Sequence, residues 1–298
     1  QKKLAQGVIH FRNCFGVRVS GPITMGYDYV KTGLISGFGN DWLRLGAFKT
    51  QLDGSDTAPS AAMWTAYPGR GDYNGILYMT QEELDDIVLR GHEAGFQVCV
   101  HAMGTRAIEI ALNSFERALN RIPKRDHRFR IEHCHFCEEK IADRIRDLGV
   151  IPVLAPGWIY WVGDSYLEKY HQEWLDWVIA ARRMLDHGVK IVFHSDMPVI
   201  PSNPLPAIYS AVSRRTESGK EVGVKQRIGL KDALRAYTVN GAYANFEEKM
   251  KGSIEIGKLA DLIVLSNDIL RVETEEIKNL KVDLTMVDGV IRYQRVGA

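Results

Sequence analysis

Residues 98–119, VCVHAMGTRAIEIALNSFERAL, combine two hydrophobic patterns in one short stretch. The apolar run Val98–Val100 predicts a buried strand, and the polar residue His101 ends it. Further on, apolar residues recur with the spacing of one helical face: Ile108, Ala111, Leu112, Phe115 and Leu119. The stretch therefore predicts a strand that hands over directly to a helix.

The same unit recurs along the chain. Upstream, residues 80–83 (TQEE) have the form of a capping box that starts a helix ending near Gly95. Downstream, we predict strands at 128–133, 150–154 and 190–196, a helix ended by Gly149, and one helix through 174–185. Such alternation is typical of parallel strands with crossover helices, so we expect these strands to be adjacent and parallel in an α/β fold.

The last part of the chain, residues 251–298, has a different pattern. Short apolar runs at 262–265, 282–287 and 290–291 read as antiparallel strands, and Asp288-Gly289 is a turn signal between the last two. We therefore predict a separate β layer after a first domain that spans residues 1–250.

Composition narrows the classes of partner. The 298 residues include 38 basic and 37 acidic side chains, so the chain lacks the basic field that nucleic acid or an anionic membrane would need. No apolar run approaches the roughly 20 residues that span a bilayer, and four scattered cysteines do not form a disulfide framework. These features predict a cytoplasmic enzyme with a small-molecule substrate, and they leave a homodimer open.

Three polar residues stand where predicted strands end: His101, His133 and Asp196. In a parallel barrel the active site is built at this carboxyl face, so we expect the three to converge. Imidazoles and a carboxylate can hold a divalent metal ion. The Cys-x2-Cys pair Cys134 and Cys137 invites a zinc-knuckle interpretation, but no second ligand pair follows nearby.

Five segments also form a linked series: HAMGTRAI (101–108), RIEH (130–133), SDMPV (195–199), ALRAYTVNGA (233–242) and GSIEIGKLADL (252–262). Together they resemble the YtcJ-like branch of the amidohydrolase superfamily, which includes N-substituted formamide deformylases. The similarity extends from about Leu43 to the C-terminus. It implies a (β/α)8 TIM barrel over residues 1–250, and it makes residues 251–298 the C-terminal part of a composite β-sandwich.

The resemblance also implies a set of metal ligands. His101 and His133 correspond to the ligands on strands five and six, and Asp196 to the strand-eight carboxylate that binds metal and acts as general base. Lys49 matches the strand-four lysine, which can be carboxylated and bridge two ions. The implied cofactor is one or two divalent ions, with Zn2+ expected. The implied reaction is hydrolysis of a non-peptide C–N bond in amides or N-acyl and N-formyl amines by metal-activated water.

Further residues are assigned to the substrate pocket. Arg214 resembles the family's arginine near the substrate entrance, and His135 lies two residues beyond a strand end. Trp158 begins an aromatic cluster that we place in a long loop after strand seven, where it can roof the pocket. Asp53, next to Gly54, is expected to shape a turn. His194 is expected to be a polar loop or strand residue, with a place in the pocket lining as the alternative.

The chain departs from the family pattern in one major respect. The His-x-His segment of strand one is absent, and residues 7–11 (GVIHF) resemble strand two. We therefore expect an N-terminally truncated fragment that lacks strand one. The alternative is a non-catalytic binding or regulatory barrel that has lost its first pair of metal ligands.

Overall fold

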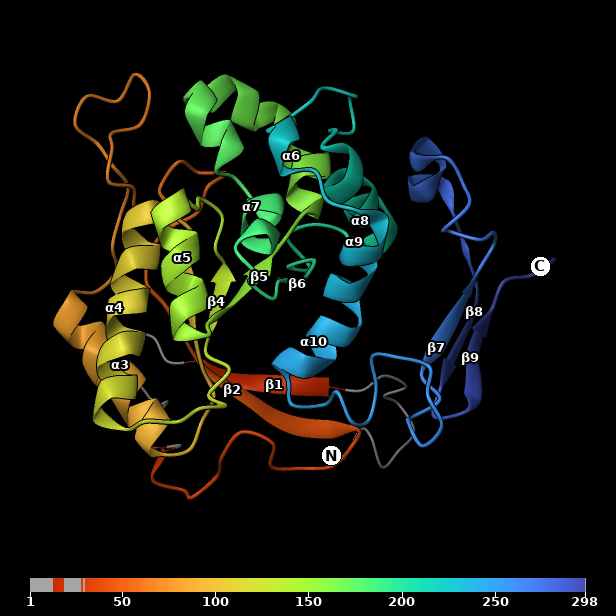
Figure 1. Cartoon of the computed structure of the whole chain (residues 1–298), viewed down its shortest axis with the longest axis horizontal. Helices are drawn as coiled ribbons and strands as arrows, with labels where there is room; N and C mark the ends of the chain where they lie inside the picture. Colours follow the sequence, from red (N-terminus) through yellow and green to blue (C-terminus); the bar gives the residue numbers. More distant parts are fainter. Residues whose placement is uncertain (1–12, 19–27, 29, 298) are drawn as a thin grey trace.

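A parallel sheet of six strands forms the centre of the molecule (Figure 1). The computed structural model describes residues 13–18, 28 and 30–297. Each strand is hydrogen-bonded to the next one in the sequence. The strands are β1 (Asn13–Arg18), β2 (Leu43–Gln51), β3 (Val98–Ala102), β4 (Arg130–His133), β5 (Ile151–Leu154) and β6 (Val192–Phe193). The predicted order of the strands near residues 98, 130, 151 and 192 is confirmed.

Helices connect the strands and pack against the outer face of the sheet (Figure 1). They are α3 (Gln81–Glu93), α4 (Thr105–Arg121), α5 (Glu139–Leu148), α6 (Gly157–Lys169), α7 (Ala181–Asp186), α8 (Pro204–Ser213), α9 (Leu230–Tyr237) and α10 (Val239–Ala244), with 3-10 turns η1 (Gln172–Asp176), η2 (Val224–Gln226) and η3 (Thr274–Asn279). The core lies between sheet and helices, where Phe48 on β2 and Val98 on β3 meet Gly91 of α3. No helix of the described residues is long and apolar enough to cross a membrane.

Local sequence signals explain where two helices begin and end. The Thr80 hydroxyl accepts the N–H of Glu83, and the Glu83 carboxylate accepts the N–H of Thr80 at 2.8 Å. This is the predicted capping box, which satisfies two main-chain donors at the start of α3. At the end of α5, Gly149 adopts φ +64°, a left-handed conformation that favours glycine. Both predictions are confirmed.

One predicted helix is wrong. The single helix through residues 174–185 is instead split into η1 and α7, and α6 occupies part of the region where we placed a long loop. The break falls at Val178, which forms a β-bridge with Phe136, and at Ile179, whose N–H donates to the carbonyl of His135 at 2.6 Å. Ile179 has φ +49°, which a continuous helix cannot contain. Pairing with the segment after β4 therefore overrides the local helical pattern.

Within the described ranges, the parallel sheet is open between its edge strands β1 and β6. The second-strand segment that we predicted at residues 7–11 lies outside the described residues. What the structure establishes is thus a parallel half-barrel, with the carboxyl ends of β2 to β6 at one edge.

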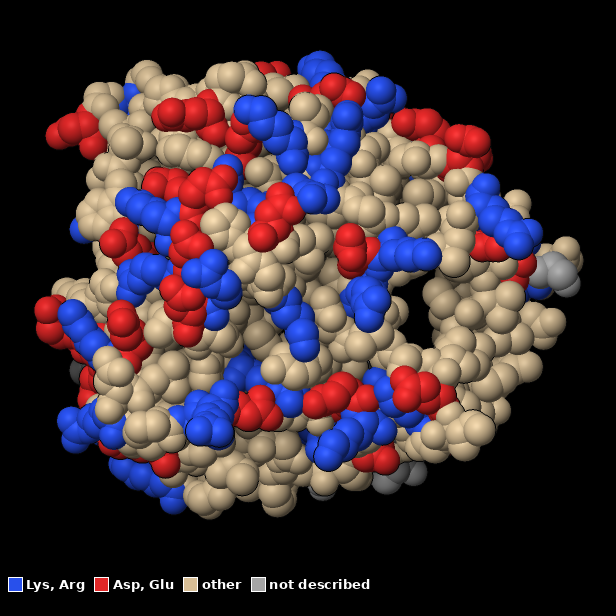
Figure 2. All heavy atoms as spheres, viewed as in Figure 1, with Lys and Arg blue, Asp and Glu red and all other residues tan. Residues whose placement is uncertain are grey.

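A second, antiparallel sheet lies to one side of this body (Figure 1). It consists of β7 (Leu262–Leu265), β8 (Val282–Val287) and β9 (Val290–Gln294), which confirms the predicted strands in the last segment. A cavity of about 790 Å³ separates the two sheets; Arg130, Glu132 and His194 line one side of it, and Ile263 and Met286 the other. Figure 2 shows an opening through the molecule on the side of this second sheet.

Candidate metal centre

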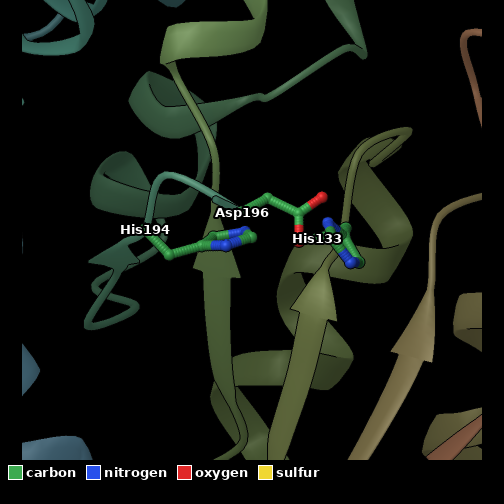
Figure 3. A group of neighbouring side chains, drawn as sticks. All are labelled: His133, His194 and Asp196. Carbon is green, nitrogen blue, oxygen red and sulfur yellow. The ribbon is translucent and has the colours of Figure 1, made fainter. Parts of the chain in front are cut away.

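Three side chains converge at the carboxyl edge of the parallel sheet (Figure 3). His133 is the last residue of β4, His194 follows β6 directly, and Asp196 comes two residues later. One potential ligand atom of each lies within 4.8 Å of the others. The described part of the chain contains no other such group of three or more His, Cys, Asp or Glu residues. Two imidazoles and a carboxylate at this spacing form a donor set for a divalent ion.

His101, on β3, lies beside this group. Its ring centroid is 4.6 Å from that of His133, so the predicted convergence of the two histidines is confirmed. His101 Nε2 is 3.1 Å from the main-chain oxygen of Gly54 and 3.5 Å from Asp53 Oδ1. A carbonyl oxygen can only accept a hydrogen bond, so Nε2 carries the hydrogen and Nδ1 keeps a lone pair. A histidine held in this way can bind a metal through Nδ1.

Two imidazole nitrogens in the group have no hydrogen-bond partner among the described residues. They are Nδ1 of His133 and Nε2 of His194, and both are buried. A buried polar atom without a partner costs free energy unless a ligand satisfies it. The observation fits a divalent ion held by these side chains.

His194, for which the sequence predicts a polar loop or strand residue or a place in the pocket lining, is brought into the group by the structure. Its position directly after a strand, at the same strand end as Asp196, was the signal that could have identified it.

The backbone at the centre is strained. His133 and Cys134 have φ values of +75° and +46°, and Asp196 has φ +60°. Left-handed conformations are uncommon outside glycine, and they concentrate at functional sites where the surrounding structure enforces them. In this centre they fall on two of the three grouped residues.

The electrostatics of the centre favour neutral imidazoles. Burial lowers the pKa of His101 and of His194 to about 4, and it lowers the pKa of His133 well below its ordinary value. Burial also raises the pKa of Asp196 above that of a free carboxyl group. Metal ions bind the neutral form of imidazole, so these histidines are in the required state near pH 7.

Lys49 belongs to the same interior. Its neighbour Phe48 faces the helices, so Lys49 faces the opposite side of the sheet. The positive charge of Lys49 contributes to lowering the pKa values of His133 and His194. This places the amine within electrostatic range of the centre. Its carboxylation stays a prediction.

Asp53 ties two loops together beneath the centre. Its fully buried carboxylate accepts the main-chain N–H groups of Ala62, Met103 and Gly104 at 2.9 to 3.0 Å. Burial raises the pKa of Asp53 to about 7, although these donors act to lower it. A Cβ atom at Gly104 would lie 2.0 Å from the Ala62 oxygen, so only glycine permits this approach. Asp53 thus shapes its loop, as expected, and also positions His101.

The three residues assigned to the substrate pocket have different surroundings. His135 is fully buried, 5.6 Å from His133 and 5.4 Å from Trp158 between ring centroids, and Trp158 lies on α6. Arg214 is also fully buried, and its guanidinium donates to the main-chain oxygens of Val178, Ile179 and Val222. These contacts hold Arg214 as a clamp between segments, and its role in substrate binding stays a prediction.

Comparison with known proteins gives three consistent matches. The model of the family described as "Amidohydrolase family" matches residues 14–293. An N-substituted formamide deformylase from Arthrobacter pascens is 34% identical over 258 residues, which are 86% of this chain and 47% of that protein. The putative amidohydrolase YtcJ of Bacillus subtilis is 25% identical over 257 residues, 85% of this chain and 48% of that protein.

The fold is also similar to a solved structure. The crystal structure of an uncharacterized metal-dependent hydrolase from Pyrococcus horikoshii superimposes with a TM-score of 0.78 at 25% sequence identity. The match covers 92% of this chain and 54% of that one. The chain thus spans about half the length of the curated relatives it matches.

Proposed function

We propose that this chain, which belongs to the amidohydrolase family, hydrolyses carbon–nitrogen bonds other than peptide bonds. Membership of the family confirms the resemblance predicted from the sequence. The proposed substrates are small amides, in particular N-acyl or N-formyl amines. The observation that carries the proposal is the group of His133, His194 and Asp196, with two buried imidazole nitrogens that lack partners among the described residues.

The residues that would hold a divalent ion are His133, His194 and Asp196, with His101 beside them and Lys49 on the inner face. When bound, such an ion polarises a carbonyl group and lowers the pKa of a water molecule. Zinc is the proposed metal because it suits imidazole and carboxylate ligands. A second ion would need Lys49 as a carbamate ligand. Elemental analysis would identify the metal and the number of ions that each chain binds.

Asp196 is the proposed general base. It would accept a proton from the attacking water and return it to the leaving nitrogen, which becomes an amine. Partial burial supports this role, because it raises the pKa of Asp196. A general base works best when its pKa is close to the pH at which the reaction runs. Its φ of +60° holds the side chain toward His133 and His194 (Figure 3).

The substrate would meet His135 and Trp158 on the side of the centre formed by α6. Trp158 offers an apolar surface for the acyl or amine group, and His135 a polar contact. Arg214 would act on the substrate only through the segment that it clamps, since its donors already bond main-chain oxygens.

We also propose that the half-barrel belongs to a (β/α)8 barrel domain over residues 1–250, and that residues 251–298 are part of a β-sandwich. The support is the sequential parallel order of β1 to β6 and the separation of β7 to β9 as an antiparallel sheet.

The test combines metal content with turnover. The protein is produced from the whole reading frame that encodes this chain, loaded with zinc, measured by elemental analysis, and assayed against a panel of N-acyl and N-formyl amines. His133→Ala and His194→Ala should lower zinc content and turnover together. The matched control is His171→Ala, since His171 is exposed and outside the group. A zinc-loaded wild type that turns over no member of the panel would contradict the proposed activity and favour a binding role.

A further inference from the structure

A buried arginine holds a segment that lies far from it in the sequence. Arg214 directly follows α8 and is only 1% exposed. Its side-chain nitrogens donate to three main-chain carbonyl oxygens: Nε to that of Val222 at 2.8 Å, Nη1 to that of Ile179 at 3.2 Å and Nη2 to that of Val178 at 2.9 Å. A buried charge costs free energy unless it is hydrogen-bonded. The guanidinium and these carbonyl groups therefore hold one another in place.

The segment that Arg214 holds also pairs with the residues that follow β4. Residues 177–179 lie antiparallel to residues 135–137, and main-chain hydrogen bonds of 2.6 and 3.0 Å flank the bridge between Val178 and Phe136. Successive residues of such a pair turn their main-chain groups to opposite sides. The carbonyl of Val178 therefore points away from residues 135–137 and is available to Arg214.

Left-handed backbone conformations occur on both sides of this pairing. Ile179 has φ +49°, and His133 and Cys134 have φ +75° and +46°. For a β-branched residue such as Ile179 this conformation is a clear outlier. Strained conformations of this kind persist only where the surrounding contacts enforce them. On the Ile179 side these contacts include the guanidinium of Arg214, and the pairing connects them to the segment that begins at His133.

We infer that Arg214 is a positioning residue, which holds the segment after β4 through residues 177–179 and so keeps His133 in the geometry of the metal centre. This inference rests on the proposed function, in which His133 is a metal ligand. The side chain of Arg214 bonds main-chain oxygens, so its effect on His133 passes through the backbone. Loss of a group that orients a metal ligand typically weakens metal binding about 10- to 100-fold.

A pair of variants separates this role from a general contribution to stability. Arg214→Met removes the guanidinium and keeps an unbranched side chain. The matched control is Arg128→Met at the amino end of β4, where Arg128 is 8% exposed and donates to the main-chain oxygen of Tyr243. Both substitutions should destabilise the fold, but only the first should loosen the segment after β4. Each variant is made in the protein produced from the whole reading frame.

The first experiment is hydrogen exchange of the metal-free protein, read by mass spectrometry at pH 7.5. Peptides that cover residues 134–138 and 177–180 should exchange about tenfold faster in Arg214→Met, because hydrogen bonds to a charged group are lost. A peptide from β3 serves as the reference for global unfolding. In Arg128→Met, the two segments should change no more than this reference.

Two further measurements cover the case in which Arg214→Met does not fold. Arg214→Lys keeps the charge, but a single ammonium cannot present the parallel donors that reach Val178 and Ile179. It should accelerate exchange in the same two segments to a smaller degree. In the wild type, these segments should exchange as slowly as β3. Fast exchange there in the wild type would overturn the inference, whichever variants fold.

The second experiment is a zinc titration in competition with a chelator. The Kd for zinc should rise about 10- to 100-fold in folded Arg214→Met and stay at the wild-type value in Arg128→Met. An unchanged Kd in Arg214→Met, or an equal rise in the control, would contradict the inference. A wild type that binds zinc but hydrolyses no amide would contradict the proposed function alone, because exchange and zinc binding are measured without turnover. A wild type that binds no zinc would contradict both.

Discussion

The two ends of β4 carry histidines in opposite states. Before the strand, His127 uses both nitrogens: Nε2 donates to the Leu148 oxygen at 2.9 Å, and Nδ1 accepts the N–H of Phe129 at 2.9 Å. At the carboxyl end, Nδ1 of His133, the last residue of β4, is buried without a partner among the residues described, and so is Nε2 of the neighbouring His194, which follows β6.

The neighbouring residues differ in the same way. Arg128, at the amino end, forms ion pairs with Asp126 and Glu248 and lies 3.9 Å from the ring centre of Tyr243. At the carboxyl end, the neighbours of His133 are other imidazoles: the ring centroids of His101 and His194 lie 4.6 Å and 5.0 Å from that of His133. The difference shows which end stabilises the fold and which end is available for a ligand. Substitutions at the amino end should reduce stability, and those at the carboxyl end should reduce metal binding and catalysis.

The largest effect is expected for Asp196→Asn at the carboxyl end. Asparagine has a similar shape but cannot accept the proton from water, and loss of a general base costs about 10² to 10⁴ in rate. Turnover of an N-formyl amine by the zinc-loaded variant measures the effect, with the thermal unfolding temperature as the control for folding. Full activity in the variant would contradict the role of Asp196.

Zinc bound at His133 and His194 should stabilise the folded chain. A ligand that binds only the folded state adds about 2.7 kcal/mol to the free energy of unfolding at 100 times its Kd. Thermal unfolding with zinc and with a chelator should show this increase in wild type and little of it in His133→Ala or His194→Ala. An equal increase in all three proteins would show that zinc binds elsewhere.

At the amino end, His127→Gln should lower stability and leave the metal centre intact. Glutamine cannot make both hydrogen bonds of the imidazole, and a buried group left unsatisfied costs about 1–3 kcal/mol. Urea unfolding at pH 7.5 measures the loss, and zinc titration of the folded variant should give the wild-type Kd. A changed Kd would mean that the two ends of β4 are coupled.

The smallest effect is expected for the pH dependence of the stability that His127 contributes. Burial lowers the pKa of His127 in the folded chain. Below about pH 6.5, His127 is therefore protonated in the unfolded chain while it is still neutral in the folded chain. The stability from neutral His127 is therefore complete above that pH and is lost as the pH falls toward the folded-state value. The change is at most about 1.4 kcal/mol per pH unit for one proton.

Urea unfolding of wild type and His127→Gln at pH 7.5 and 5.5 gives the difference between the two proteins at each pH. The advantage of the wild type should be smaller at pH 5.5. An advantage that grows with acidification would mean that His127 is charged in the folded chain.

Local sequence determined the element types and the strand ends of this protein. Some signals act over only a few residues and are therefore visible in the sequence itself. They are the capping box at Thr80, Gly149 at the end of α5, and the apolar runs of β3 to β5. Because parallel strands align their carboxyl ends, His101 and His133 could also be expected to meet.

Contacts between distant segments decided the rest. The break in the predicted helix at Ile179 depends on the His135 carbonyl. The His135 ring in turn is held by the carboxylate of Asp56, 79 residues away in the chain, at 2.7 Å from Nδ1. That Nε2 of His194 is buried without a hydrogen-bond partner among the described residues likewise depends on the side chains packed around it. A hydrogen-bond partner far along the chain leaves no periodic pattern near the residue it controls, so only the tertiary structure could assign these roles.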